Sequence, residues 1–220
     1  MPGSARPDPS PDDGGTIVVT GTGRISVQPD VADLRLGVTV ARPSVEAART
    51  EAARTMDAIL VAVDAAGVPR ADVRTAMLSV QPRYDYRDGR APALTGYDIA
   101  NVVEVTVRDL GRLGAVIDGT LGAGATSMDG LTFRVADPAP AERDARIRAM
   151  AEARARADVL AESAGLAIDG VIDIVEGTPV RPPSPFAKAE RMATAADVAT
   201  PLEAGELEVS VSVTVTYRTR

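Results

Sequence analysis

The chain has 220 residues, a net charge of −7, and neither cysteine nor histidine. This length suits one large domain or two small ones, and the missing residue types exclude disulfides, thiolate metal sites and Ser-His-Asp or Cys-His catalysis. The acidic balance argues against nucleic acid and anionic membranes as partners, so composition favours a non-enzymatic protein without a cofactor; a carboxylate-based enzyme is the catalytic alternative.

The first fifteen residues are rich in proline, aspartate, glycine and serine, which predicts a disordered N-terminal tail over residues 1–15. They lack the cationic start and apolar run of a signal peptide, so we expect a cytoplasmic location for the chain as written. No stretch approaches the roughly 20 apolar residues of a membrane span, and none is expected.

Hydrophobic periodicity predicts the elements of the chain in order. The first half contains strands over 17–27 and 33–40, a helix over 44–66, a hairpin of strands over 73–86 and 97–108, and a short helix over 110–121. The second half contains a strand over 127–135, a long helix over 139–164, a strand over 171–175, a long Pro- and Ala-rich loop over 178–205, and a final strand over 207–217.

These elements predict an α+β fold, with a mixed, mostly antiparallel sheet packed by two long helices and one short helix. Residues 16–220 are expected to form a single domain. The strand-helix-strand runs over 33–80 and 128–176 resemble each other weakly, which suggests a duplicated β-α-β unit sharing one sheet. The return strand of the hairpin is apolar on both faces and should lie centrally.

The glycines of the first strand, Gly21 and Gly23, are best explained as a strand bulge, because a phosphate-binding turn would open a helix rather than continue a strand. In the long helix, the apolar steps should face the core, and they are Ile147, Met150, Ala153, Ala157, Leu160 and Ala164. Asp85, Asp88 and Asp98 lie near one hairpin, but they lack the spacing of a calcium loop, so a solvated turn is the better interpretation. No metal site is predicted.

Three of the four tyrosines, Tyr84, Tyr86 and Tyr97, fall within fourteen residues of the predicted hairpin. Aromatic packing across the strands explains this cluster, and a ligand or subunit contact remains the alternative.

The final strand is about twice the usual length of five or six residues. Its apolar side chains alternate with polar ones at Val209, Val211, Val213 and Val215. A strand this long must lie centrally, be covered, or pair with another subunit, so a homo-oligomer is expected and these valines are candidate interface residues.

Six segments in order resemble the SIMPL-domain family, which includes bacterial periplasmic immunogenic and oxidative-stress-defence proteins. Four of them are IVVTGTGRISVQPDVADLRLGV (17–38), TGYDIANVVEVTVRDL (95–110), ARIRAMAEARARADVLAESAGL (145–166) and LEVSVSVTVTY (207–217). The resemblance implies a mixed sheet domain without established catalytic residues, homo-oligomers in some members, and loose links to envelope integrity or stress defence. It also implies that bacterial relatives are often exported.

Three hypotheses follow from the sequence. The first is a homo-oligomeric scaffold joined through sheet edges and the hairpin. The second is a monomeric or dimeric binding module that uses the tyrosine hairpin for a protein or small ligand. The third is a carboxylate-based enzyme.

Overall fold

The computed structural model describes residues 15–86, 91–177 and 202–220, so the predicted tail over 1–15 and most of the predicted loop over 178–205 lie outside the described residues. Contacts divide the chain into two compact units, each described by itself. Of the described residues, the first unit holds 15–27, 137–177 and 206–220, and the second holds 28–86, 91–136 and 202–205. A single domain over 16–220 therefore stays a prediction.

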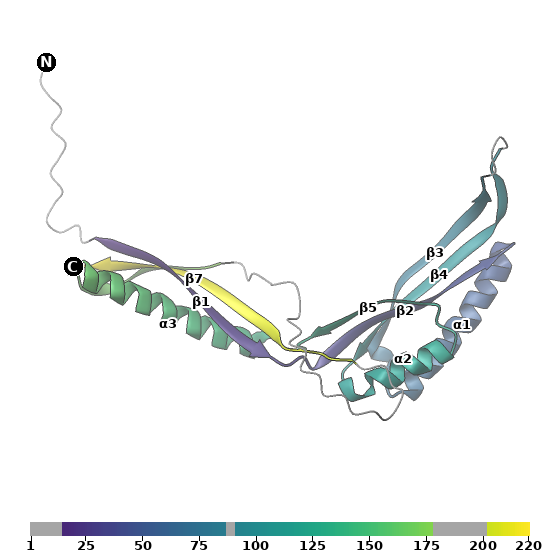
Figure 1. Cartoon of the computed structure of the whole chain (residues 1–220), viewed down its shortest axis with the longest axis horizontal. Helices are drawn as coiled ribbons and strands as arrows, with labels where there is room; N and C mark the ends of the chain where they lie inside the picture. The colour runs from purple at the N-terminus through teal and green to yellow at the C-terminus, as the bar shows by residue number, and fades with distance from the viewer. Residues whose placement is uncertain (1–14, 87–90, 178–201) are drawn as a thin grey trace, which may run out of the picture. The chain divides into compact units, whose positions relative to one another are not determined.

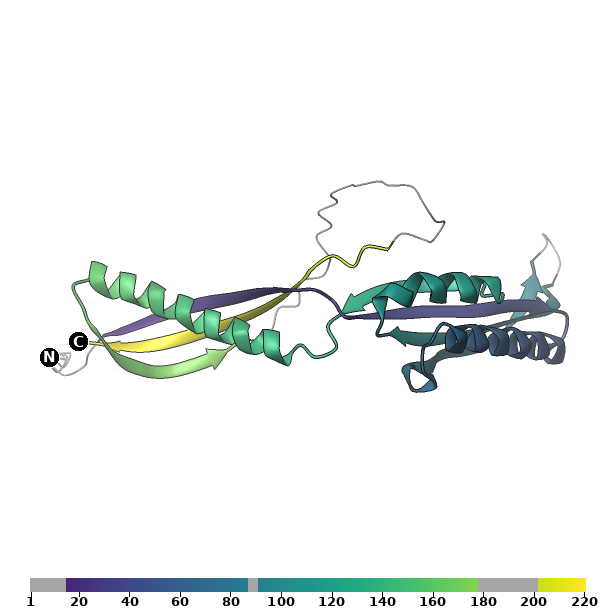
Figure 2. The same cartoon turned by 90° about the horizontal axis from the view of Figure 1, so that it is seen from below.

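The first unit is a three-stranded antiparallel sheet with one long helix along it (Figure 1, Figure 2). Its strand order is β1-β7-β6, which places β7 in the centre and leaves β1 and β6 as edges. The elements are β1 (Thr16–Val27), α3 (Ala139–Ser163), β6 (Ile168–Glu176) and β7 (Leu207–Thr219).

The second unit is a four-stranded antiparallel sheet in the order β3-β4-β2-β5. Helices α1 and α2 pack on its apolar face, where the larger of the two cores lies. The elements are β2 (Val31–Arg42), α1 (Val45–Ala65), a 3-10 turn (Arg70–Asp72), β3 (Val73–Asp85), β4 (Ala93–Val107), a second 3-10 turn (Leu110–Arg112), α2 (Leu113–Gly122) and β5 (Ser127–Arg134).

The α+β class, with two long helices and one short one, is confirmed, but the strands form two sheets instead of one. The predicted duplicated β-α-β unit is wrong in the second half of the chain, because β5 pairs with β2 whereas β6 pairs with β7. The reason is packing: Leu131 and Phe133 of β5 lie against the core of the second unit, and Ile168 of β6 lies against that of the first.

Several local predictions for the second unit are confirmed. β4 lies centrally, between β3 and β2. The helix predicted over 44–66 begins after Ser44, whose side chain accepts a hydrogen bond from the N–H of Ala47 and caps the helix. Its buried face includes Met56 and Ile59, as the periodicity indicated. None of the helices in the described part of the chain has the length and apolar character that a bilayer crossing requires.

Helix α3 buries only part of the predicted face: Ala153 and Ala157 are buried as expected. The prediction turned Ile147 and Leu160 toward the core, yet these side chains are 62% and 50% exposed. The buried face is instead a row of alanines at every fourth position: Ala145, Ala149, Ala153, Ala157 and Ala161. Small side chains allow the helix axis to approach the sheet more closely than leucine or isoleucine would.

The predicted bulge at Gly21 and Gly23 is also wrong, since β1 pairs with β7 in unbroken register from end to end. The two glycines face α3 instead. A Cβ atom on Gly21 would overlap the carbonyl oxygen of Ala149, and one on Gly23 would overlap that of Ala145. The glycines are therefore the positions where the helix backbone lies directly on the strand.

We predict that Gly21→Ala or Gly23→Ala destabilises the protein by about 1–3 kcal/mol or more, because the added methyl group pushes α3 off the strand. The measurement is the free energy of unfolding in urea. Gly170→Ala is the matched control, because Gly170 also lies in a strand of the first unit and its Cβ would meet no atom within 4 Å. Equal stability of the three variants would contradict the close packing.

Candidate functional site

The candidate site is built on the open edge of β1. Toward β7, the carbonyl of Gly15 accepts a hydrogen bond from the N–H of Thr219 at 2.8 Å. Because the backbone groups of a strand alternate in direction, the even-numbered residues of β1 turn their N–H and C=O groups to the open edge. An edge of this kind is a template for a further strand unless something covers it.

Polar side chains of α3 cover part of this edge. They come from every fourth helical position, on the row beside the buried alanines. The three hydrogen bonds run from Arg148 Nη1 to the carbonyl of Arg24 at 2.9 Å, from the N–H of Thr22 to Glu152 Oε2 at 2.5 Å, and from Arg156 Nη1 to the carbonyl of Thr20 at 2.6 Å. We call these three side chains the edge caps.

The spacing of the edge caps follows from the rise per residue of an α-helix and of a β-strand. Four helical residues rise about 6 Å, and two strand residues rise about 6.6 Å. A helix antiparallel to β1 therefore presents one side chain to each edge-facing residue. The next position in the row, after Arg156, is Leu160, which lies level with Val18 and has no polar atom to offer. The capping therefore ends at Thr20.

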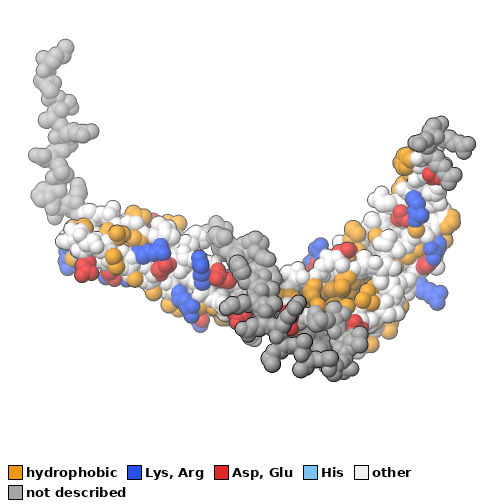
Figure 3. Space-filling view, in the orientation of Figure 1, with side chains coloured by type: hydrophobic (Ala, Val, Ile, Leu, Met, Phe, Trp, Pro, Cys, Tyr) orange, Lys and Arg blue, Asp and Glu red, His pale blue; other side chains and the backbone are white. Residues whose placement is uncertain are grey.

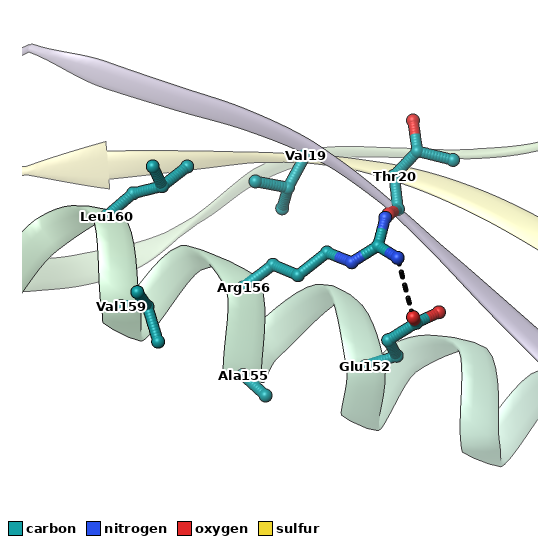
Figure 4. Close-up of a pocket in the computed structure, with 7 residues that line it drawn as sticks. All are labelled: Val19, Thr20, Glu152, Ala155, Arg156, Val159 and Leu160. Carbon is teal, nitrogen blue, oxygen red and sulfur yellow. Dashed lines mark hydrogen bonds and ion pairs between the residues drawn. The ribbon is translucent and has the colours of Figure 1, made fainter.

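A shallow groove of about 570 Å³ opens where the capping ends, and Figure 4 draws the residues that line it. Figure 4 shows the Arg156 side chain reaching across to Thr20 and Glu152, with Leu160 on the other side of Arg156 along the helix and Val19 on the strand above it. The lining is mostly aliphatic and consists of Val19, Thr20, Glu152, Ala155, Arg156, Val159 and Leu160.

The carboxyl group of Glu152 is held in its charged form. The N–H of Thr22, and after it the guanidinium of Arg156, lower the pKa of the Glu152 carboxyl below its usual value. Arg156 Nη2 also donates to Glu152 Oε1 at 2.6 Å, which links two caps to each other. At neutral pH the site therefore presents a carboxylate between two guanidinium groups along the edge.

The opposite edge of the same sheet, β6, has a different character. Four large aliphatic side chains on it are about half exposed: Val171, Ile172, Ile174 and Val175. The strand carries Asp169, Asp173 and Glu176 and no basic residue. Two register shifts interrupt its pairing with β7 before Asp173, and the pairing is regular from there to Glu176.

The predicted interface valines of β7 lie inside the first unit. Val211, Val213 and Val215 are buried against α3, and Val209 is half-buried. The long β7 strand needs no partner strand from another subunit, because β1 and β6 of the same chain pair along its two sides. We therefore assign these side chains a core role in the subunit and look for contact surfaces at the edges.

The structure brings together two of the three predicted tyrosines. The rings of Tyr84 and Tyr86 are 6.3 Å apart, and both side chains are exposed. Tyr97 is half-buried and lies opposite Pro82 across the hairpin.

The remaining acidic candidates form no metal centre in the described part of the chain. The carboxylate of Asp98 accepts a hydrogen bond at 2.7 Å from Arg83, and this bond lowers the pKa of Asp98. Asp88 lies outside the described residues. The structure thus places an ion pair where the sequence suggested a solvated turn.

Sequence reasoning missed both the edge caps and the β6 edge. The signal for the caps was present, since Arg148, Glu152 and Arg156 repeat at four residues beside alanines of the same spacing. That pattern is also typical of a solvated helix face, and it points to a strand edge only once the glycines of β1 are known to face the helix.

Fold and site together define an α+β protein of two antiparallel units whose exposed sheet edges are its candidate contact surfaces. Comparison with known proteins agrees with the family resemblance. The SIMPL family, described as "Protein of unknown function (DUF541)", matches residues 17–217. The chain belongs to the SIMPL family.

Two relatives illustrate the range of similarity. The "26 kDa periplasmic immunogenic protein" of Brucella melitensis biotype 1 is 32% identical over 208 residues, which cover 91% of this chain and 83% of the relative. The "Uncharacterized protein YggE" of Escherichia coli (strain K12) is 34% identical over 149 residues, covering 68% of this chain and 60% of the relative.

We predict that Glu152→Gln lowers the melting temperature at neutral pH and has no effect in strong acid. The folded-state pKa of Glu152 is below its unfolded value of about 4.3, so its stabilising contribution is present above that value and is lost as the pH falls through the folded-state pKa. The measurement is the melting temperature of both proteins from pH 7 to pH 2. Glu162→Gln, on the same helix, is the control; a difference that persists unchanged at pH 2 would contradict the assignment.

Proposed function

We propose that this protein is a non-enzymatic, self-assembling scaffold whose subunits meet through exposed sheet edges, above all β3 and β6. The observation that carries this proposal is where large apolar side chains are exposed. Four lie on β6, as described above, and four lie on β3, which is an edge of the second sheet: Met77, Leu78, Val80 and Tyr84.

Exposed aliphatic side chains on a strand edge favour association for two reasons. The edge offers unpaired backbone groups, and burial of apolar surface contributes about 25 cal/mol per Å². Apolar side chains are also visible at the end of the β3–β4 hairpin, at the right of Figure 3. The edge of β1 is capped over part of its length, and it exposes a large aliphatic side chain, Val18, only at its uncapped end.

Two observations support a role without catalysis. Each carboxyl whose pKa is shifted in the described part of the chain is shifted downward, mainly by a hydrogen bond, as in Asp33 beside Arg134 and Glu104 beside Arg74. A general acid needs the opposite shift, so these groups act as structural ion pairs. The sequence of 220 residues also has no histidine or cysteine, and the names of the relatives describe no reaction.

The relatives bear on where the scaffold works. The name of the Brucella relative places that protein in the periplasm. We propose an envelope location for this chain on that basis, in place of the cytoplasmic location expected from its first fifteen residues, together with the loose link to envelope integrity or stress defence that the family resemblance implies.

A second candidate function is favoured by the exposed pair Tyr84 and Tyr86 on the hairpin. Tyrosines in contact with each other at the surface are suited to a protein or small ligand, and this use requires no assembly. In that case the protein is a monomeric or dimeric binding module, and Tyr84→Ala should leave the fold intact and remove binding.

The test of the scaffold is the native mass by light scattering over a dilution series. We expect a discrete mass several times 22.8 kDa. Ile174→Lys on β6 and Val80→Lys on β3 should each lower it, because a charge at the edge opposes strand pairing. Val61→Lys is the control, since Val61 is at least as exposed as Ile174 and Val80 but lies on helix α1. A mass of one subunit at every concentration would refute the scaffold and favour the hairpin module.

A further inference from the structure

We propose that a second copy of this chain adds its β6 strand to the open end of β1, with Ile174 of the second copy in the groove beside Leu160. This inference rests on the proposed function, because it names one pair of surfaces through which the scaffold is joined. The two surfaces lie on opposite edges of one sheet. The contact is therefore heterologous, so each subunit binds one neighbour through β1 and another through β6.

The open end of β1 can receive a strand. The edge caps reach Thr20 but not Val18, whose backbone groups face the same open edge and whose side chain is 60% exposed. The last cap, Arg156, is itself about half exposed. Exposed ion pairs of this kind are worth little, so an incoming strand can displace Arg156 at low cost.

The regular end of β6 can supply that strand. The N–H of Gly177 donates to the carbonyl of Ser212 on β7 at 2.9 Å. Because the backbone N–H and C=O groups of successive strand residues point in opposite directions, Ile174 and Glu176 turn theirs away from β7 and toward the open edge. The bulges lie before this segment, so they do not interrupt it.

The faces of the two strands match. β1 and β6 both run antiparallel to β7 and are therefore parallel to each other, so a side-by-side repeat of the sheet joins them in parallel with the helices on one face. Ile174 lies opposite the buried Val215 and thus on the α3 side, where the groove is. Val175 and Val18 both lie on the other side, opposite threonines of β7.

The charges match in the same register. With Val175 of the second copy level with Val18, Ile174 is level with Ile17 on the α3 side. Glu176 of the second copy is then level with Val19, next to Thr20, where Arg156 lies.

The side chains of β6 carry only acidic charges, whereas two of the three edge caps on the opposite edge are arginines. Within its own subunit Glu176 accepts from Arg146 Nε at 3.0 Å, and this exposed ion pair is exchanged for one with Arg156 on association. Two copies joined by β6 alone would bring like charges together, which disfavours the symmetric alternative.

Cysteine cross-linking tests the pairing directly, because the natural chain has no cysteine. Val18→Cys and Val175→Cys chains are purified separately, mixed, and oxidised under dilute conditions. Neighbouring strands lie about 4.8 Å apart, which is within the Cα separation that a disulfide allows. We expect a covalent heterodimer from the mixture, little from either chain alone, and a ladder beyond the dimer from the double variant. Val61→Cys mixed with Val18→Cys is the control.

A second variant tests the groove without a covalent bond. Leu160→Glu places a carboxylate in the next capping position, where it can accept from the N–H of Val18 and repel Glu176 of the second copy. We expect the concentration at which the assembly dissociates to rise roughly tenfold or more, equivalent to about 1.4 kcal/mol of association free energy. Val61→Glu should leave it unchanged.

The outcomes separate this inference from the proposed function. Homodimers from Val175→Cys alone, or no heterodimer while light scattering shows assembly, would overturn the β1–β6 pairing and leave the scaffold standing. A mass of one subunit at every concentration would overturn both.

Discussion

The contact between the backbone of α3 and β1 at Gly21 and Gly23 sets the structure of the first unit. A side chain at either position would overlap a carbonyl oxygen of the helix. The alanine row on α3 completes the contact, because any larger residue there would lift the helix from the sheet. Few large side chains fill this core, so its stability depends on close approach rather than on apolar volume.

The same closeness gives the helix a second role at the strand edge. Since α3 lies beside β1 at backbone distance, side chains next to the alanine row reach the open edge and bond its backbone groups. The row of edge caps changes from polar to apolar at Leu160. The β1 edge is therefore covered over part of its length, and a groove lies where the cover stops. The β6 edge has no equivalent row beside it and exposes aliphatic side chains. A subunit with two unlike edges is suited to directional assembly.

Much of the fold could be predicted from periodicity, because element type and order depend on local patterns. Helix α1 and the central position of β4 are examples, since their apolar residues repeat at the expected steps. The division into two sheets could not be predicted, because β5 and β6 choose their partners through contacts far apart in sequence. Ile147 and Leu160 misled the prediction of the buried face of α3, because large apolar side chains are normally expected in the core ahead of alanine. That expectation fails here because a strand with glycines lies opposite the helix. Of the site, sequence located the exposed tyrosine pair but not the edge caps.

Amide hydrogen exchange at the edge of β1 tests the central claim most directly. The N–H groups of Thr22 and Val18 face the same edge, but only the first donates to a helix side chain. The account predicts that the dilute, dissociated subunit exchanges slowly at Thr22 and rapidly at Val18, and that Val18 becomes protected as the protein assembles. Equal exchange at both positions in the dissociated subunit would contradict the capping of this edge by α3.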